Sequence, residues 1–250
     1  MKLYTIPHRG QLLLQKPNLA WAVVIDVLRY STTLAAGLAN GALRAYPARE
    51  EEEARKYHAD LVSRCEPALL CGEREGLPLP GFDLGNSPLE FTRERVAGKT
   101  LVTLTTNGTL TLRTCAGAVR ILLGSFVNAP ALVAYLARHN PDSVYLVCSG
   151  KENAFCIEDF ACAGYVARLL FRAMPDNVLS DPHTIAACRL MADYHNNIER
   201  LLFDSNHGKY LCSLGFSEDL KYCARPGEID AVPAYDGTYL VPAEAMGGET

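Results

Sequence analysis

The pattern of apolar and polar positions changes its period at residue 26, where a strand is expected to give way to a helix. Residues 22–25 are apolar without polar alternation, which is typical of a strand buried on both faces. From Ser31 onward the apolar side chains fall at helical spacing, and Asn40-Gly41 form a stop signal. The pattern predicts a strand that ends at Asp26, a short loop that contains Arg29, and a helix.

Similar strand and helix patterns alternate along most of the chain. Further strands are expected at 68–71, 99–106, 121–123 and 143–148, and helices at 48–58, around 110–115, at 128–136, at 160–171 and within 180–205. Ser87 and Glu90 have the spacing of a capping box, which predicts a helix start, and the C-terminal part is expected to hold a finishing strand and loops.

This order predicts an α/β fold with a mainly parallel or mixed sheet and helices on both faces, in three layers. The length of 250 residues fits a single domain, 1–250. Two similar lobes, at about 1–120 and 121–250, are an open alternative.

Composition and charge narrow the class of protein. The net charge is −4 without a basic run, which argues against a nucleic-acid partner. No apolar stretch is long enough to span a membrane, and the N-terminus lacks the apolar core of a signal peptide, so we expect a cytoplasmic protein. The nine cysteines are odd in number and mostly lie in apolar runs, which predicts buried, reduced thiols.

Polar residues follow the predicted strands at the points where they end. They are Asp26 and Arg29, Glu73 and Arg74, residues 105–109, Ser125, and Ser149. If the strands are parallel neighbours, these groups meet at one edge of the sheet. Carboxylates bind Mg²⁺, and free N–H groups at helix N-termini attract phosphate, so the pattern predicts a Mg²⁺-assisted phosphate site. The alternative is that Asp26 only caps the next helix and that Arg29 only pairs with it.

The sequence gives little support for the phosphate-binding motifs of other protein classes. The chain has no P-loop motif, no Gly-x-Gly-x-x-Gly turn after the first predicted strand, and no Asp-x-Asp at Asp26. Cys162 and Arg168 have the spacing of thiolate phosphatases, but they lie in a predicted helix interior. His207 lies in a predicted turn and is a candidate ligand-binding group.

A set of motifs, in order along the chain, resembles the 2-phosphosulfolactate phosphatase (ComB-like) family. They are Asp26-Val27-Leu28-Arg29 with Ser31-Thr32-Thr33, Gly72-Glu73-Arg74, Gly81-Phe82-Asp83-Leu84-Gly85-Asn86-Ser87-Pro88, Thr105-Thr106-Asn107-Gly108-Thr109, Gly124-Ser125-Phe126 with Asn128, and Glu158-Asp159 with Cys162-Ala163-Gly164. The resemblance implies a Mg²⁺-dependent phosphatase that converts 2-phosphosulfolactate to sulfolactate and phosphate, on the route to coenzyme M in some methanogens. Leu110 stands where the family often has arginine, a change expected to weaken anion binding if that arginine reaches the ligand.

Roles follow for the site residues. Asp26, Asp159, Glu73 and Glu158 are the expected metal ligands, and Arg29 is expected to clamp a phosphate or sulfonate group. The expected catalytic residues are Asp26, Arg29, Glu73 and Asp159, and the expected substrate-binding residues are Arg74, Asn86, Ser87, Thr106, Asn107, Gly108, Thr109, Ser125, Asn128 and Ser149. The sequence leaves attack by water and a covalent intermediate both open.

The expected partner is a small anionic phosphorylated substrate, and a homodimer is compatible with the sequence. The alternative function is that of a non-enzymatic binding protein for a small phosphorylated metabolite.

Overall fold

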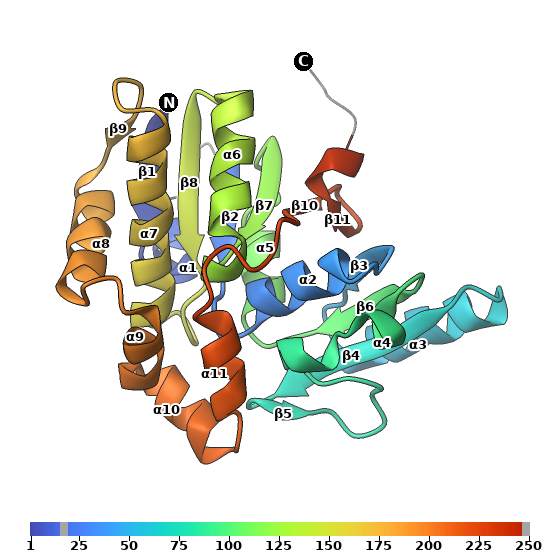
Figure 1. The fold of residues 1–250 in the computed structure, drawn as a ribbon. Coiled ribbons are helices and arrows are strands. Elements are labelled where there is room, and N and C mark those ends of the chain that lie inside the picture. The colour runs from blue at the N-terminus through green and yellow to red at the C-terminus, as the bar shows by residue number, and fades with distance from the viewer. Residues whose placement is uncertain (16–19, 247–250) are drawn as a thin grey trace.

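A computed structural model describes residues 1–15 and 20–246 of the chain, and within them one large mixed sheet is flanked by helices (Figure 1). The strands are β1 (Lys2–Ile6), β2 (Trp21–Ile25), β3 (Arg44–Pro47), β4 (Ala68–Arg74), β5 (Leu77–Pro78), β6 (Thr100–Leu104), β7 (Arg120–Gly124), β8 (Ser143–Cys148), β9 (Leu179–Ser180), β10 (Pro233–Tyr235) and β11 (Leu240–Pro242). Their order across the sheet is β5-β4-β6-β3-β11-β10-β7-β2-β8-β1-β9. The predicted α/β class with a mixed sheet is confirmed.

The helices lie between these strands and after β9. They are α1 (Arg9–Gln15), α2 (Tyr30–Ala39), α3 (Glu51–Ser63), α4 (Arg93–Val96), α5 (Gly108–Thr114), α6 (Ala129–His139), α7 (Ile157–Ala173), α8 (Pro182–Asp193), α9 (Ile198–Asp204), α10 (Asn206–Ser213) and α11 (Ser217–Cys223), with short 3₁₀ turns η1 (Pro88–Glu90), η2 (Phe126–Asn128) and η3 (Ala243–Ala245). None of the described helices is long and apolar enough to cross a membrane.

Two blocks of parallel strands make up most of the sheet. The first block is β4, β6 and β3, and the second is β7, β2, β8, β1 and β9. Between them, β10 and β11 pair antiparallel with each other and with β7 and β3, so the two blocks run in opposite directions across the sheet. In Figure 1 the lower end of β8 and the β4–β5 hairpin nevertheless face the same space beside α10 and α11.

The core explains why β2 lacks polar alternation. Val23 and Ile25 pack into one apolar cluster with residues of α6 and α7, whereas Ala22 and Val24 pack into a second cluster with residues of α2 and α5. All four side chains are buried, so both faces of this strand are covered. The second cluster also contains Leu101 of β6, and thus extends into the first block.

Several local expectations need correction. The C-terminal part was expected to hold a strand and loops, but it also forms α10 and α11, and the helical stretch within 180–205 is broken between α8 and α9, where His195 and Asn196 have positive φ. Ser87 does not form a capping box: its hydroxyl donates to Asp219, and the carboxylate of Glu90 accepts from the N–H of Gly85. Only the single 3₁₀ turn η1 follows Ser87.

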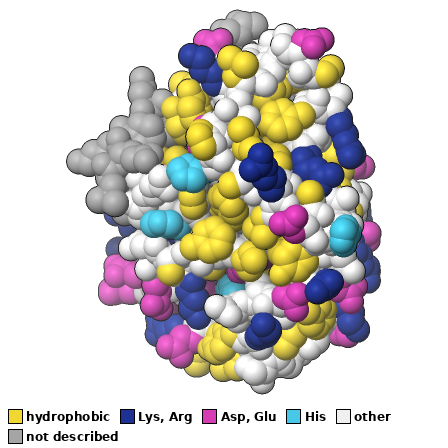
Figure 2. Space-filling model, turned by 90° about the vertical axis from the view of Figure 1, so that its left-hand side faces the viewer, with side chains coloured by type: hydrophobic (Ala, Val, Ile, Leu, Met, Phe, Trp, Pro, Cys, Tyr) yellow, Lys and Arg dark blue, Asp and Glu magenta, His cyan; other side chains and the backbone are white. Residues whose placement is uncertain are grey.

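The side of the molecule near α8 is seen directly in Figure 2. Apolar side chains are exposed on it between scattered Lys, Arg and acidic side chains. Ile185 of α8 is 44% exposed, for example. On this face the basic side chains are interspersed and do not form one continuous patch.

Candidate active site

A cleft of about 500 Å³ lies where the carboxyl ends of strands from both blocks meet α10. Its polar lining comes from the segments after β2, β4, β6 and β8 and from α10, and includes Asp26, Arg29, Glu73, Arg74, Asn86, Thr105, Thr106, Asn107, Lys151, Glu158, Asp159, His207 and Tyr210. The predicted convergence is thus observed for the groups after β2, β4 and β6, but Ser125 and Ser149 do not line the cleft. The strands belong to two blocks of opposite direction. The cleft is the candidate active site because ligands of open α/β sheets bind beyond the carboxyl ends of the strands.

Asp26 lies at the floor of the cleft and is only 7% exposed. Burial raises the pKa of its carboxyl from 3.8 to about 6, because the charged form loses hydration; the neighbouring Glu73 and Glu158 add to the rise, while His207 and the Tyr30 N–H oppose it. Asp26 does not pair with Arg29, so the interpretation of the two residues as a mere ion pair is wrong. A buried carboxylate with a raised pKa in a cleft is typical of a functional group.

Asp159 joins the two loops that flank Asp26. Its Oδ1 accepts from the N–H of Val27 at 2.9 Å, and its Oδ2 accepts from the N–H of Gly150 at 3.1 Å. Burial, with Asp26 and Glu158 nearby, raises the pKa of Asp159 well above its usual value. Since both oxygens already accept hydrogen bonds from the protein, Asp159 fixes the geometry of the floor.

Glu158 and His207 form a pair of an acidic and a basic side chain at the cleft. Nδ1 of His207 lies 3.5 Å from Oε1 of Glu158, which is buried. His207 is in the first turn of α10 and not in a loop, because the hydroxyl of Ser205 accepts the N–H of Gly208 as a helix cap. The candidate role of His207 at the site thus agrees with its position.

Glu73 connects the two loops of the first block. Its Oε2 accepts from the N–H of Gly76 at 2.7 Å, and its Oε1 accepts from the N–H and the hydroxyl of Thr106 at 3.1 and 3.2 Å. This carboxylate therefore holds the β4–β5 turn against the segment that leads into α5.

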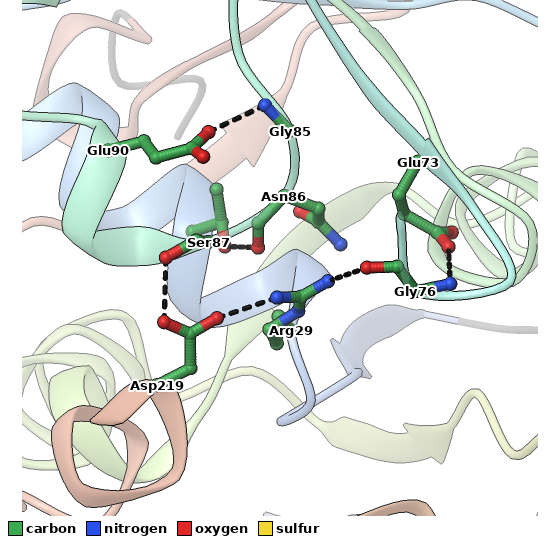
Figure 3. A network of polar contacts seen from close by, with 9 residues as sticks. Arg29, Glu73, Gly76, Gly85, Asn86, Ser87, Glu90 and Asp219 are labelled. Atoms are coloured by element: carbon green, nitrogen blue, oxygen red, sulfur yellow. Dashed lines mark hydrogen bonds and ion pairs between the residues drawn. The ribbon is translucent and has the colours of Figure 1, made fainter. Parts of the chain in front are cut away.

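Arg29 lies at the centre of a buried polar network (Figure 3). Its Nη1 donates to Oδ2 of Asp219 at 2.6 Å, and its Nη2 donates to the carbonyl of Gly76 at 2.7 Å. Ser87 donates its hydroxyl to the other oxygen of Asp219 at 2.6 Å, and the guanidinium stacks on the ring of Phe216. Arg29 therefore positions α11 against the β4–β5 turn, and its predicted role as a clamp on the substrate stays a prediction.

The predicted substrate-binding residues divide into two groups. Arg74, Asn86, Thr106 and Asn107 line the cleft, although Arg74 also lies 3.4 Å from Glu51 on the surface. The others lie behind the lining and are Ser87, Gly108, Thr109, Ser125, Asn128 and Ser149.

Contacts inside the protein explain why several residues of this second group occupy their positions. Ser125 and Asn128 form a reciprocal capping box inside the protein. A side chain at Gly108 would overlap the ring of Tyr30, so the close approach of α5 to α2 requires glycine. The hydroxyl of Ser149 is buried and has no hydrogen-bond partner among the described residues.

Several residues at or beside the cleft were missed by the sequence patterns, among them Lys151, Tyr210 and Arg9. Lys151 and Tyr210 line the cleft, and Arg9 lies beside it, where its guanidinium donates to Asn107 and Asn153. The Ser205 cap was the available signal for α10 and hence for Tyr210. Lys151 and Arg9 have no motif around them that could have been read in advance.

The amino-acid sequence of the chain is similar to those of known proteins. The model of a family described as 2-phosphosulpholactate phosphatase matches residues 7–238. The chain belongs to the 2-phosphosulpholactate phosphatase family. A relative from Caldicellulosiruptor saccharolyticus, named a probable 2-phosphosulfolactate phosphatase, is 39% identical over 237 residues, which are 93% of this chain and 96% of the relative. A relative of the same name from Symbiobacterium thermophilum is 41% identical over 224 residues, 89% of this chain and 94% of the relative.

The donor set in this member of the 2-phosphosulpholactate phosphatase family fits a hydrated Mg²⁺ site. Among residues 1–15 and 20–246, no three His, Cys, Asp or Glu side chains converge as a metal cage. Mg²⁺ does not need one, because it binds through one or two carboxylates, several waters and phosphate oxygens. The acidic lining also includes Glu75 and Glu152, and this excess of carboxylates would attract a cation.

Proposed function

We propose that this protein is a Mg²⁺-dependent phosphatase that hydrolyses 2-phosphosulfolactate, or a closely similar small anionic phosphoester, to the hydroxy acid and phosphate. The chain is a member of a family of phosphoric monoester hydrolases, and the named relatives support the substrate. The observation that carries the proposal is the buried carboxylate Asp26 at the floor of the cleft, with Glu158 beside it.

Asp26 and Glu158 are the residues that would hold the metal. Both line the cleft, and neither carboxylate is tied up as that of Asp159 is by two backbone N–H groups. Bound Mg²⁺ supplies neutralisation of the phosphate oxygens and a source of activated water.

Other residues of the chain prepare the site around these two. Asp159 fixes the backbone after β2 and β8, so that Asp26 and Gly150 face the cleft together. Glu73 holds Thr106 and Gly76 in place from the other side. Geometry fixed before the substrate arrives lowers the cost of reaching the transition state.

Amide donors are available for the phosphate oxygens. Oδ1 of Asn107 accepts from Arg9 and from the N–H of Glu152, and its Nδ2 group has no hydrogen-bond acceptor among the described residues, so it can donate to a ligand. Asn86 also lines the cleft, and Figure 3 shows its side chain extending toward the space between Arg29 and Glu73. The side-chain amides of Asn107 and Asn86 can donate hydrogen bonds to the oxygens of an anion, although most charged side chains of the lining are acidic.

The test is phosphate release from 2-phosphosulfolactate and from a panel of simple phosphoesters, with sulfolactate identified by mass spectrometry. We expect turnover with Mg²⁺, with 2-phosphosulfolactate or a close analogue as the preferred substrate. Tight binding of 2-phosphosulfolactate without phosphate release would support the binding-protein alternative. Asp26→Asn is the matched inactive variant, because it keeps the shape of the side chain and removes its charge.

A further inference from the structure

Most basic side chains at the cleft already have protein partners. Arg29 is paired with Asp219, and Arg74 with Glu51. Lys151 differs, because no carboxylate of the described residues lies within ion-pair distance of its ammonium group. Its charge is thus available to a ligand in the cleft that it lines.

The backbone around Lys151 is anchored to the floor of the site. The N–H of Gly150 donates to Asp159, and the N–H of Lys151 donates to the carbonyl of Ala154 at 3.1 Å. Arg9 holds Asn153 of the same loop through a 2.8 Å hydrogen bond. The position of Lys151 is therefore fixed by the same residue, Asp159, that fixes the loop of Asp26.

The side chain of Lys151 is held against an aromatic ring. Its Nζ lies 4.7 Å from the centre of the Tyr210 ring, and the Tyr210 hydroxyl donates to the carbonyl of Glu75 across the cleft at 2.9 Å. A cation over an aromatic face is attracted to it without losing its charge. Tyr210 therefore restrains the ammonium group at the cleft wall and leaves its donors open.

The charges of the site determine what this ammonium can bind. The floor holds Asp26, Glu158 and Asp159, which repel any anion not neutralised by the metal. A bound cation would neutralise the phosphate group, and the ammonium of Lys151 offers a separate positive charge to a second anion on the same small substrate. We propose that Lys151 binds a carboxylate or sulfonate on the alcohol part of the substrate and so selects phosphoesters with an anionic tail, with Tyr210 as its positioning residue.

This inference rests on the proposed phosphatase function and refines its substrate class. An ammonium is a compact point charge with rotatable donors, whereas a guanidinium is a planar fork matched to carboxylate. The ammonium of Lys151 can therefore donate hydrogen bonds to either a planar carboxylate or a tetrahedral sulfonate.

The test compares Lys151→Gln with the unchanged protein, using 2-phosphosulfolactate and 2-phospholactate as substrates and inorganic phosphate as a competitive inhibitor without a tail. We expect KM for 2-phosphosulfolactate to rise about tenfold or more with little change in kcat, as for loss of a hydrogen bond to a charged group. The inhibition constant of phosphate should stay within about twofold, because phosphate has no group for Lys151 to bind. An equal rise in KM for both substrates assigns Lys151 to the carboxylate, and a rise for 2-phosphosulfolactate alone assigns it to the sulfonate.

Lys99→Gln is the matched control, because it removes the same charge. Lys99 precedes β6, whereas the site lies beyond the other end of that strand, and its Nζ donates to the carbonyl of Arg95. Tyr210→Leu should raise KM for 2-phosphosulfolactate by about two- to fivefold, and Tyr210→Phe by less, since phenylalanine keeps the aromatic face. If Tyr210 acts only through Lys151, the double variant Lys151→Gln/Tyr210→Leu should have the same KM for 2-phosphosulfolactate as Lys151→Gln alone.

Unchanged KM values in Lys151→Gln, or an equal loss of affinity for phosphate, would overturn the assignment. If the unchanged protein releases no phosphate from either substrate, the proposed function fails. Calorimetric titration with 2-phosphosulfolactate and with inorganic phosphate then tests Lys151 separately. Weaker binding of the first alone supports its role, and equal binding by both proteins rejects it.

Discussion

Arg29 and Asp219 are separated by 190 positions in the sequence, yet Nη1 of Arg29 lies 2.6 Å from Oδ2 of Asp219 and both side chains are buried. The pair connects the loop after β2 to α11, and Nη2 of Arg29 extends the connection to Gly76. A buried pair of this kind is costly to break, because the remaining charge has no water to replace its partner.

Arg29→Lys is therefore expected to lower stability as well as activity. Lysine keeps the charge but cannot donate to Asp219 and Gly76 at once, so we expect a loss of about 1.5–3 kcal/mol in the free energy of unfolding. Urea unfolding measures it. Arg64→Lys is the control: Arg64 lies 2.6 Å from Asp60, but the pair is exposed, so a change of at most about 0.5 kcal/mol is expected. A loss for Arg29→Lys no larger than that of the control contradicts this role.

Asp26→Asn should stabilise the metal-free protein while abolishing turnover. Because the folded chain holds the Asp26 proton up to a pKa of about 6 and the usual value is 3.8, folding stability falls as pH rises through this window and stays lower above it. Asparagine removes that penalty, on the order of 1–3 kcal/mol at pH 7.5 and far less near pH 4.

Urea unfolding in EDTA at the two pH values measures this difference. Asp142→Asn, a change at an exposed acid beyond the opposite end of the second block, should leave stability unchanged at both. If Asp26→Asn is less stable than the unchanged protein at pH 7.5, the carboxylate does not carry the electrostatic penalty assigned to it.

Cys162→Ser should leave turnover within a few-fold of normal. Cys162 is fully buried inside α7, and burial, with Asp159 nearby, raises the pKa of its thiol well above the usual value, so it cannot supply a thiolate nucleophile at neutral pH. Kinetics of phosphate release check this, with Cys65→Ser at an exposed position as control. A folded Cys162→Ser protein without activity would require a different mechanism.

The sequence was sufficient to place the floor of the site. An uninterrupted run of apolar, largely β-branched residues favours a strand covered on both faces, and this places Asp26 at its end, where ligands of such sheets bind. Glu73 and Thr106 were predicted at the ends of their strands and are in direct contact. The cytoplasmic location, the homodimer and the route to coenzyme M stay predictions of the sequence.

The rest of the site depends on contacts that local patterns do not encode. α10 and α11 are short helices, and nothing near Arg29 in the sequence indicates that Asp219 will pair with it. Ser125 and Asn128 follow a strand just as the residues of the cleft do, but their side chains satisfy each other and the carbonyls of Leu123 and Ala231. A polar residue after a strand can cap the next helix or face the ligand, and tertiary packing decides which.

Turnover of 2-phosphosulfolactate before and after chelation tests whether phosphate release depends on a metal held by Asp26 and Glu158. We expect that EDTA abolishes phosphate release, that Mg²⁺ restores it, and that Asp26→Asn remains inactive or is only partly rescued by excess Mg²⁺. Full phosphate release after exhaustive chelation, or normal turnover by Asp26→Asn, would contradict this dependence.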